Sequence, residues 1–241
     1  MVIAGCSSGG SSPTATAVGT KAAQPNAGST QGARAVATLG AAVSAPSCIV
    51  RPAETEGPYF VDEKINRCDI RTNTSDGKAS VGAPLALTFN VANVGSGSCT
   101  SLADATIDVW QCDAAGTYSD VSDQGFQTVG KNYLRGYQVT DSFGQAKFTT
   151  IYPGWYQGRA VHIHFKIRTT SSAGKAVEFT SQLFFDESLT DQVHAAAPYA
   201  AKGKRTLLNS GDSIYNEQLL LDTKRSGDGY AATFDIGLNM A

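Results

Sequence analysis

The clearest structural signal in the sequence is the segment Ala160-Val161-His162-Ile163-His164-Phe165-Lys166-Ile167-Arg168. From residue 161 on, apolar and polar side chains alternate strictly. This period of two predicts a half-buried β-strand over 160–168. Because side chains two residues apart in a strand project from the same face, His162 and His164 can meet one metal ion. The spacing alone is a weak signal, since paired histidines also occur in strands without a function, and copper, zinc and iron sites all use them.

The rest of the chain from residue 47 onward also shows strands separated by turns. Strands are predicted at 85–91, 105–112, 146–151, 177–185 and 230–238, with helix possible only at 189–201 and 213–221. Short strands at this spacing predict an all-β fold, an antiparallel β-sandwich with little helix and a metal site carried on its loops. We therefore expect one catalytic domain over 47–241.

Composition excludes several classes of protein. The chain has 241 residues, 41% hydrophobic and 17% charged, with a formal net charge of -2. It contains no long run of Lys or Arg, so nothing favours binding to nucleic acid or to an anionic membrane surface. Small neutral or anionic substrates remain possible.

The first 46 residues predict an export signal remnant followed by a flexible tether. Residues 7–45 contain no aromatic and no acidic residue and cannot bury enough apolar surface to order themselves. Val2-Ile3-Ala4-Gly5-Cys6 resembles a bacterial lipobox, in which the cysteine is lipidated, although the basic and apolar parts of a signal do not precede it. We expect an exported protein, either a cell-surface lipoprotein tethered to the membrane through Cys6 or a secreted or periplasmic protein.

Four further cysteines fit an oxidising compartment. Cys48, Cys68, Cys99 and Cys112 suggest two disulfides, with three possible connectivities that the sequence cannot separate. None shows the CxxC spacing of a zinc or redox site, so the alternative is buried thiols.

Two tyrosines are the candidates for the remaining metal ligands. With only three histidines in the chain, a copper/zinc superoxide dismutase site is excluded, and no acid follows His162 in the H-x-D/E pattern of ferrous sites. Tyr118 follows the turn after 105–112, and Tyr156 lies six residues before His162. Phenolate is a hard anionic donor that suits Fe(III). Taken separately, each tyrosine is better explained as an aromatic packing at a sheet edge.

Several ordered motifs together resemble the intradiol ring-cleavage dioxygenases, which include catechol and protocatechuate dioxygenases, and in particular their exported members. The resemblance covers roughly 48–185. The motifs are Thr55-Glu56-Gly57-Pro58-Tyr59-Phe60, Val109-Trp110-Gln111-Cys112-Asp113-Ala114-Ala115-Gly116-Thr117-Tyr118, Leu134-Arg135-Gly136, Tyr152-Pro153-Gly154-Trp155-Tyr156, Arg159-Ala160-Val161-His162-Ile163-His164-Phe165 and Thr180-Ser181-Gln182-Leu183-Phe184-Phe185.

The resemblance implies a non-haem Fe(III) centre with four protein ligands. Tyr118 and His164 would be the equatorial ligands, and Tyr156 and His162 the axial ones. Tyr156 would leave the metal when the substrate binds. The implied reaction is cleavage of a catechol-type diol with O2, between its two hydroxyls, to a muconate-type diacid.

The resemblance also implies roles for residues around the metal. Arg159 would stabilise the ketonised substrate, with Gln182 beside it. Gly57, Pro58 and Tyr59 would line the substrate mouth. Without the flanking motifs, Arg159 would be an exposed cation, Gln182 a strand amide, and the Gly-Pro pair a tight turn.

Three other side chains are expected to lie outside the metal-ligand set. Trp155 is expected to form a wall of the substrate pocket and Trp110 to pack in the interior. His194 lies in an Ala-rich stretch and is expected to be a solvent-exposed histidine rather than a ligand.

Two other kinds of function remain open from the sequence. One is a non-catalytic exported binding module of the same fold, which captures aromatic or metal-chelating compounds. The other is a structural cell-surface domain with an unused histidine pair. The helical region through which catechol dioxygenases dimerise is not matched, so the oligomeric state stays open, as does the catechol used.

Overall fold

The computed structural model describes residues 49–95 and 98–240. All of these residues belong to one compact unit, Ala45–Ala241. Three predictions concern residues outside the described ranges: the tether over 1–46, the lipidation of Cys6 and the pairing of Cys48. Within the described part, no helix is both long enough and apolar enough to cross a membrane.

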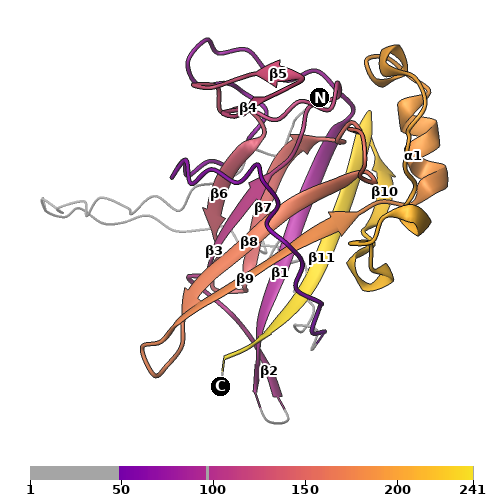
Figure 1. The fold of residues 1–241 in the computed structure, drawn as a ribbon. Helices are drawn as coiled ribbons and strands as arrows, with labels where there is room; N and C mark the ends of the chain where they lie inside the picture. Colours follow the sequence, from indigo (N-terminus) through magenta and orange to yellow (C-terminus); the bar gives the residue numbers. More distant parts are fainter. Residues whose placement is uncertain (1–48, 96–97, 241) are drawn as a thin grey trace, which may run out of the picture. The chain divides into compact units, whose positions relative to one another are not determined.

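Two β-sheets and a short hairpin make up the described fold (Figure 1), which confirms the predicted all-β sandwich. The five-stranded sheet contains β1 (Pro84–Gly95), β2 (Ser98–Ser101), β7 (Gln145–Ile151), β10 (Asp222–Ser226) and β11 (Gly229–Asn239). The four-stranded sheet has the order β6 (Arg135–Val139), β3 (Thr106–Trp110), β8 (His162–Thr170) and β9 (Ala176–Phe184). The hairpin pairs β4 (Ser122–Asp123) with β5 (Phe126–Gln127).

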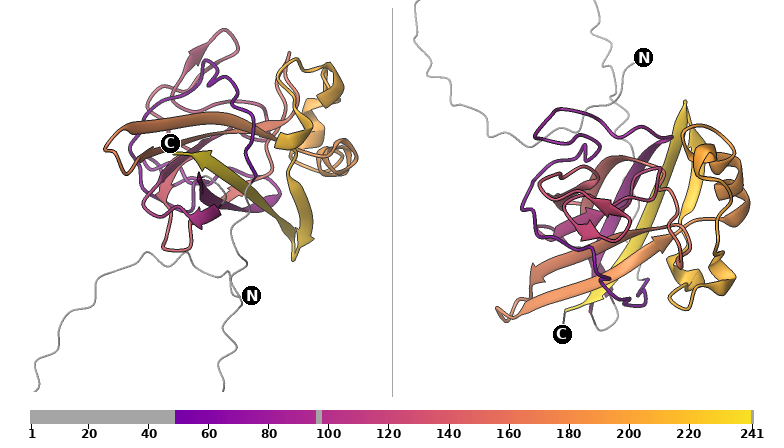
Figure 2. Two further views of the ribbon diagram at one scale, coloured as in Figure 1. Left: turned by 90° about the horizontal axis from the view of Figure 1, so that it is seen from below. Right: turned by 45° about the horizontal axis from the view of Figure 1, so that its top comes forward.

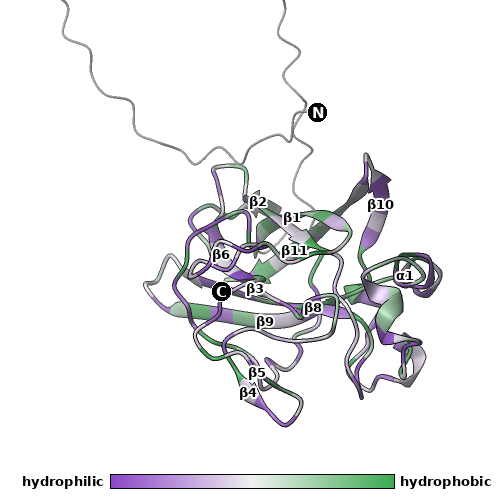
Figure 3. Ribbon diagram, turned by 90° about the horizontal axis from the view of Figure 1, so that it is seen from above, coloured by the Kyte–Doolittle hydropathy of each residue, from purple (hydrophilic) through white to green (hydrophobic). Residues whose placement is uncertain are grey.

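The six predicted strands all form, but the sheets hold more strands than the pattern indicated. The unpredicted strands β2, β4, β5, β6 and β10 have two to five residues each, too few for an alternation to stand out. β10 is an exposed edge strand, and it is hydrophilic in Figure 3. β1 and β11 run parallel, in the register Leu85↔Tyr230, whereas the other strand pairs are antiparallel.

Aromatic rings join the two sheets in the core. Phe89 of β1 lies 5.2 Å from Phe165 of β8 between ring centroids, and Phe165 lies 5.5 Å from Phe234 of β11. All three are buried. The apolar face of β8 therefore faces the other sheet, which leaves its histidine face for the opposite side.

The segment between β9 and β10 lies to one side of the sheets in both views of Figure 2. It contains α1 (Glu187–His194) and three 3-10 turns, η1 (Tyr199–Lys202), η2 (Asn209–Gly211) and η3 (Glu217–Leu219). The side chain of Asp186 caps α1 by accepting from the Leu189 amide at 2.9 Å. The helix predicted over 189–201 is thus interrupted after His194, and Pro198, which has no N–H to donate, separates α1 from η1.

The cysteine prediction is partly wrong. Cys68 and Cys99 are disulfide-bonded. Cys112 is a free thiol. It is buried because it lies just after β3 and packs against Trp110 and Tyr118 in the interior. Its Sγ approaches the Gly154 carbonyl at 3.5 Å.

Candidate metal centre

β8 presents both histidines of the pair on its buried outer face. His164 stands opposite Gln182 of β9 on one side and Trp110 of β3 on the other. The indole of Trp110 stacks on the His164 ring, with 5.0 Å between centroids and 7° between planes. The Nε2 atoms of His162 and His164 are 3.0 Å apart. Strand periodicity has therefore brought two imidazole nitrogens to one point.

The protonation of these rings leaves lone pairs for a metal. Nδ1 of His162 lies 2.7 Å from the Ala160 carbonyl and donates to it, so its Nε2 carries a lone pair. Burial, aided by the charge of Arg159, lowers the pKa of His162 to about 3, and burial lowers the pKa of His164 well below its usual value. Both imidazoles are neutral at neutral pH. Nδ1 of His164 is buried and has no hydrogen-bond partner among the described residues.

The two predicted tyrosines converge on the same nitrogen. The hydroxyl oxygen of Tyr118 lies 3.5 Å from Nε2 of His162, and that of Tyr156 lies 3.3 Å from it. Tyr118 follows a turn in which the Asp113 carboxylate accepts from the amides of Ala115 and Thr117, each at 2.9 Å. Tyr118 is fully buried and Tyr156 is half-buried. Tyr156 is therefore the donor nearest to solvent.

Both phenols are neutral unless a cation stands beside them. Burial raises the pKa of Tyr118 well above its usual value. Burial also raises the pKa of Tyr156, to about 12, although the charge of Arg159 opposes the rise. A pair of phenolates at this place requires a strong positive charge between them.

The spacing of the four donor atoms fits a single metal ion. Two ligand atoms that each lie about 2.1 Å from a metal are ~3.0 Å apart at a right angle and ~3.4 Å apart at the tetrahedral angle. The separations from Nε2 of His162 to the other three donors run from 3.0 to 3.5 Å. Among the described residues, no three His, Cys, Asp or Glu side chains gather into a metal site. A metal held here would need both tyrosine oxygens.

A buried ion pair holds the predicted catalytic arginine beside this cluster. Nε of Arg159 donates to the Asp212 carboxylate at 2.9 Å, and a terminal nitrogen donates to Oε1 of Gln182 at 2.5 Å. The side chain of Asp212 is only 2% exposed, and it also accepts from the Ala160 amide at 2.8 Å. Gln182 in turn donates to the Thr55 carbonyl at 2.8 Å. Asp212 was missed by sequence reasoning, since it lies 53 residues from its partner in an unremarkable loop.

The segment predicted to line the substrate mouth does border the cluster. Gly57 has a φ of +72°, and a Cβ there would lie 3.2 Å from Cε1 of His164. The ring of Tyr59 stacks on that of Tyr118 at 4.5 Å, and its hydroxyl donates to Asp123 of β4 at 2.6 Å. Pro58 is exposed in the turn between them. A side chain at Gly57 would thus crowd His164.

The side chain of Trp155 contacts Lys202 and Gly203. Its indole nitrogen donates to the Gly203 carbonyl at 3.2 Å, and the ammonium of Lys202 lies 4.7 Å from its ring centroid. Its predicted place in a substrate wall stays a prediction.

The expectation that His194 is solvent-exposed is wrong. His194 is 8% exposed, and its Nε2 donates to the Pro153 carbonyl at 3.0 Å. Its ring stacks on Tyr199 at 5.0 Å. The sequence showed only an Ala-rich stretch, whereas α1 turns this residue toward the segment before Tyr156.

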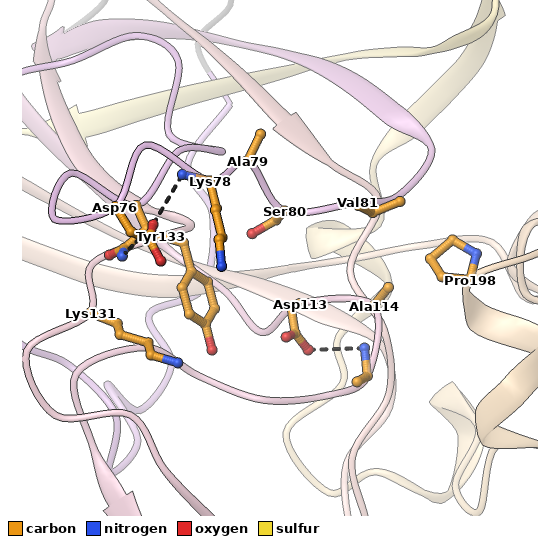
Figure 4. A pocket seen from close by; sticks show the side chains of 12 residues that line it. Asp76, Lys78, Ala79, Ser80, Val81, Asp113, Ala114, Lys131, Tyr133 and Pro198 are labelled. Carbon is orange, nitrogen blue, oxygen red and sulfur yellow. Dashed lines mark hydrogen bonds between the residues drawn. The ribbon is translucent and has the colours of Figure 1, made fainter.

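A pocket of about 390 Å³ is lined in part by Asp113, Ala114 and Ala115 of the turn that precedes Tyr118. Figure 4 shows Lys78, Lys131 and Tyr133 around it together with Asp113. None of the four metal-donor residues lines it. Its position therefore does not mark the metal centre, whose location follows from the donor geometry.

Comparisons with known proteins identify the family of the chain. A family model described as "Dioxygenase" matches residues 55–239. The protocatechuate 3,4-dioxygenase beta chain of Burkholderia cepacia is 27% identical over 181 residues, which cover 70% of each chain.

Solved structures show the same likeness in three dimensions. An intradiol ring-cleavage dioxygenase from Tetranychus urticae is 29% identical, with a TM-score of 0.67, and the match covers 80% of this chain and 95% of that one. The dioxygenase domain of a carbohydrate-binding fusion protein from Streptomyces sp. SirexAA-E is 27% identical, with a TM-score of 0.57, over 80% of this chain and 100% of that one. Since the family model spans more than half of the sequence and these relatives share its fold, the chain belongs to the intradiol ring-cleavage dioxygenase family.

Proposed function

We propose that this chain is a non-haem Fe(III) dioxygenase that cleaves catechol-type diols between their hydroxyls, using O2, to muconate-type diacids. The observation that carries the proposal is the convergence of two phenol oxygens and the His164 Nε2 on Nε2 of His162, each 3.0 to 3.5 Å from that atom. Family membership supports catechol-type ring cleavage in general.

The donor set favours a trivalent ion. Two buried phenols with raised pKa values give up their protons only to a strong positive charge, and hard oxygen donors suit a hard cation. Tyr118, Tyr156, His162 and His164 would hold Fe(III) there, and the bound ion would supply Lewis-acid binding of both deprotonated diol oxygens, whose electron-rich ring can react with O2.

Tyr156 is suited to receive a proton from the substrate. It is the only half-buried residue of the four donors, and the two residues that follow it are exposed. A phenolate at this position can accept a diol proton on its phenolic oxygen and turn toward solvent, because burial away from the metal charge favours the neutral phenol. Tyr118, which is fully buried, stays in place.

Arg159 supplies a fixed positive charge beside the reacting ring. Asp212 and Gln182 each accept from one N–H group at the edge of its guanidinium, so the charge is already oriented before the substrate arrives. A preoriented cation stabilises negative charge that develops on a substrate oxygen during the reaction. Gln182 has no exposed surface, and it ties this arrangement to Thr55 in the segment before the mouth.

The test is to load purified protein with iron and measure colour and oxygen uptake. We expect a burgundy charge-transfer band from tyrosinate to Fe(III) and stoichiometric O2 uptake with catechol. Tyr156→Phe should weaken the band and abolish most turnover. Tyr133→Phe, which changes a tyrosine outside the donor set, should alter neither. A protein with full iron, no band and no uptake would instead be a binding module, and the proposal would fail.

We also propose that the protein works outside the cytoplasm. The disulfide-bonded state of Cys68 and Cys99 supports this location, since the cytosol keeps cysteine thiols reduced. Cell fractionation together with thiol labelling under non-reducing conditions tests it. Recovery of the protein in the cytosol with both thiols free would contradict it.

A further inference from the structure

The two loops that carry the tyrosine donors touch each other directly. The amide of Gly154, two residues before Tyr156, donates to the carbonyl of Asp113 at 3.1 Å. Asp113 begins the turn that ends at Tyr118. This bond and the contact of the Cys112 Sγ with the Gly154 carbonyl both lie at Gly154, so they do not by themselves set the angle between the loops.

Lys202 makes a second junction between the same loops from a distant part of the chain. Its Nζ donates to the Trp155 carbonyl at 2.5 Å and also to the Ala115 carbonyl. The Trp155 carbonyl belongs to the residue directly before Tyr156, and the Ala115 carbonyl belongs to a residue three positions before Tyr118. The Trp155 indole closes the arrangement by donating to Gly203 at 3.2 Å.

The junction is tightly packed on the side of Gly116. Gly116 has a φ of +81°, and a Cβ at that position would overlap both Nζ of Lys202 and the carbonyl oxygen of Trp155. The two loops and the lysine are therefore in van der Waals contact, and a shift of one must move the others.

The segment that leads to Tyr156 is held along its whole length by side chains. The carbonyls of Tyr152 and Pro153 accept from Tyr199 at 2.7 Å and from His194 at 3.0 Å. These side chains, like Lys202, come from the α1–η1 segment. Lys202 differs from them in that it also reaches the Tyr118 loop.

We propose that Lys202 is a positioning residue of the metal centre: by joining the carbonyls of Trp155 and Ala115 it sets the separation and angle of the Tyr156 and Tyr118 phenols. The metal role rests on the function proposed above. The loop junction itself is a property of the metal-free protein. The two can therefore be tested separately.

The first experiment uses hydrogen exchange in metal-free, full-length protein. Lys202→Met keeps the length of the side chain but removes its donors, and Lys204→Met is the matched control, since Lys204 is exposed two residues away. We expect amides of 113–118 and 154–159 to exchange at least tenfold faster in Lys202→Met and at the wild-type rate in Lys204→Met. Equal exchange in both variants would overturn the junction. Should Lys202→Met not fold, Lys202→Gln, which is too short to reach both carbonyls, replaces it.

The second experiment reads the metal centre in iron-loaded protein. In Lys202→Met we expect a shifted tyrosinate charge-transfer band and a tenfold or larger fall in kcat with a smaller change in KM, because Tyr156 must leave and return along a set path. Unchanged band and kcat alongside faster exchange would overturn the positioning role. A wild type that takes up no iron would refute the proposed function instead, while the exchange result would still decide whether Lys202 holds the loops.

Discussion

The two histidine donors and the two tyrosine donors are held by different means. His162 and His164 belong to β8, which is paired with β9 along its whole length and, at His164, with β3 as well. Tyr118 and Tyr156 stand in loops, and contacts from far along the chain hold them, among them Lys202. The spacing of the histidines is thus a property of strand geometry, whereas the spacing of the phenols depends on how loops are joined.

This difference suggests a division of labour at the metal. The rigid strand would supply the permanent ligands, and the loop nearest to solvent would supply the ligand that moves. Substitutions in the strand should therefore abolish the metal, while substitutions around the loops should change rates and spectra first.

The largest effect is expected for His164→Ala. Mutating a residue that only hydrogen-bonds to a metal ligand lowers metal affinity ~10–100-fold. Removing a ligand itself should lower the affinity further, so iron content should fall below about a tenth of the wild-type value. The strand should persist, because its ladder bonds are backbone bonds. Metal analysis and circular dichroism measure both.

His194→Gln is the matched control for that experiment. His194 is also buried, but it donates to a carbonyl and lies outside the donor set, and glutamine can still donate. Iron content in this variant should stay near wild type. A similar loss of iron in both variants would mean that general disruption, rather than loss of a ligand, removes the metal.

Arg159→Met should act on turnover more than on metal content. Loss of a preoriented charge aimed at the transition state costs ~10²–10³-fold in kcat. It also leaves the Asp212 carboxylate buried without its partner, which should lower the free energy of unfolding by ~3–5 kcal/mol. Adding Asp212→Asn should restore much of the stability but none of the activity. Recovery of activity in the double variant would show that Arg159 is only structural.

Acid should weaken the metal-free protein through the histidine pair. The folded pKa of His162 is about 3, far below its unfolded value of ~6.5. Its contribution to stability is therefore complete above pH 6.5 and is lost as pH falls toward 3, by up to ~1.4 kcal/mol per pH unit. Urea unfolding between pH 7 and 4 measures this slope. His162→Gln should flatten it, and an unchanged slope would contradict the buried neutral state.

Tyr59→Phe should have the smallest effect. It removes the hydroxyl that donates to Asp123 while the ring remains stacked on Tyr118. Water can replace this hydrogen bond, so KM for catechol should change less than about fivefold. Tyr59→Ala, which also removes the stacked ring, should alter the charge-transfer band. Equal spectra for the two variants would show that the stacking does not influence Tyr118.

The parts of the site that could be predicted are those encoded within a few residues. The alternation around His162 gave the strand and the shared face, and the turn beginning at Asp113 placed Tyr118 at a loop end. Asp212 and Lys202 carry no such local pattern, and each acts 47 or more residues away from the loop that it holds. The errors on His194 and Cys112 have the same origin, since burial depends on neighbours that are distant in sequence.

The shared face of the two imidazoles follows from local sequence, because the pleat of a strand repeats every two residues wherever that strand lies. The positions of the two phenols and of the charges beside them follow from long-range folding. Loop positions are set by long-range packing and hydrogen bonds between segments, and no short stretch of residues contains that information.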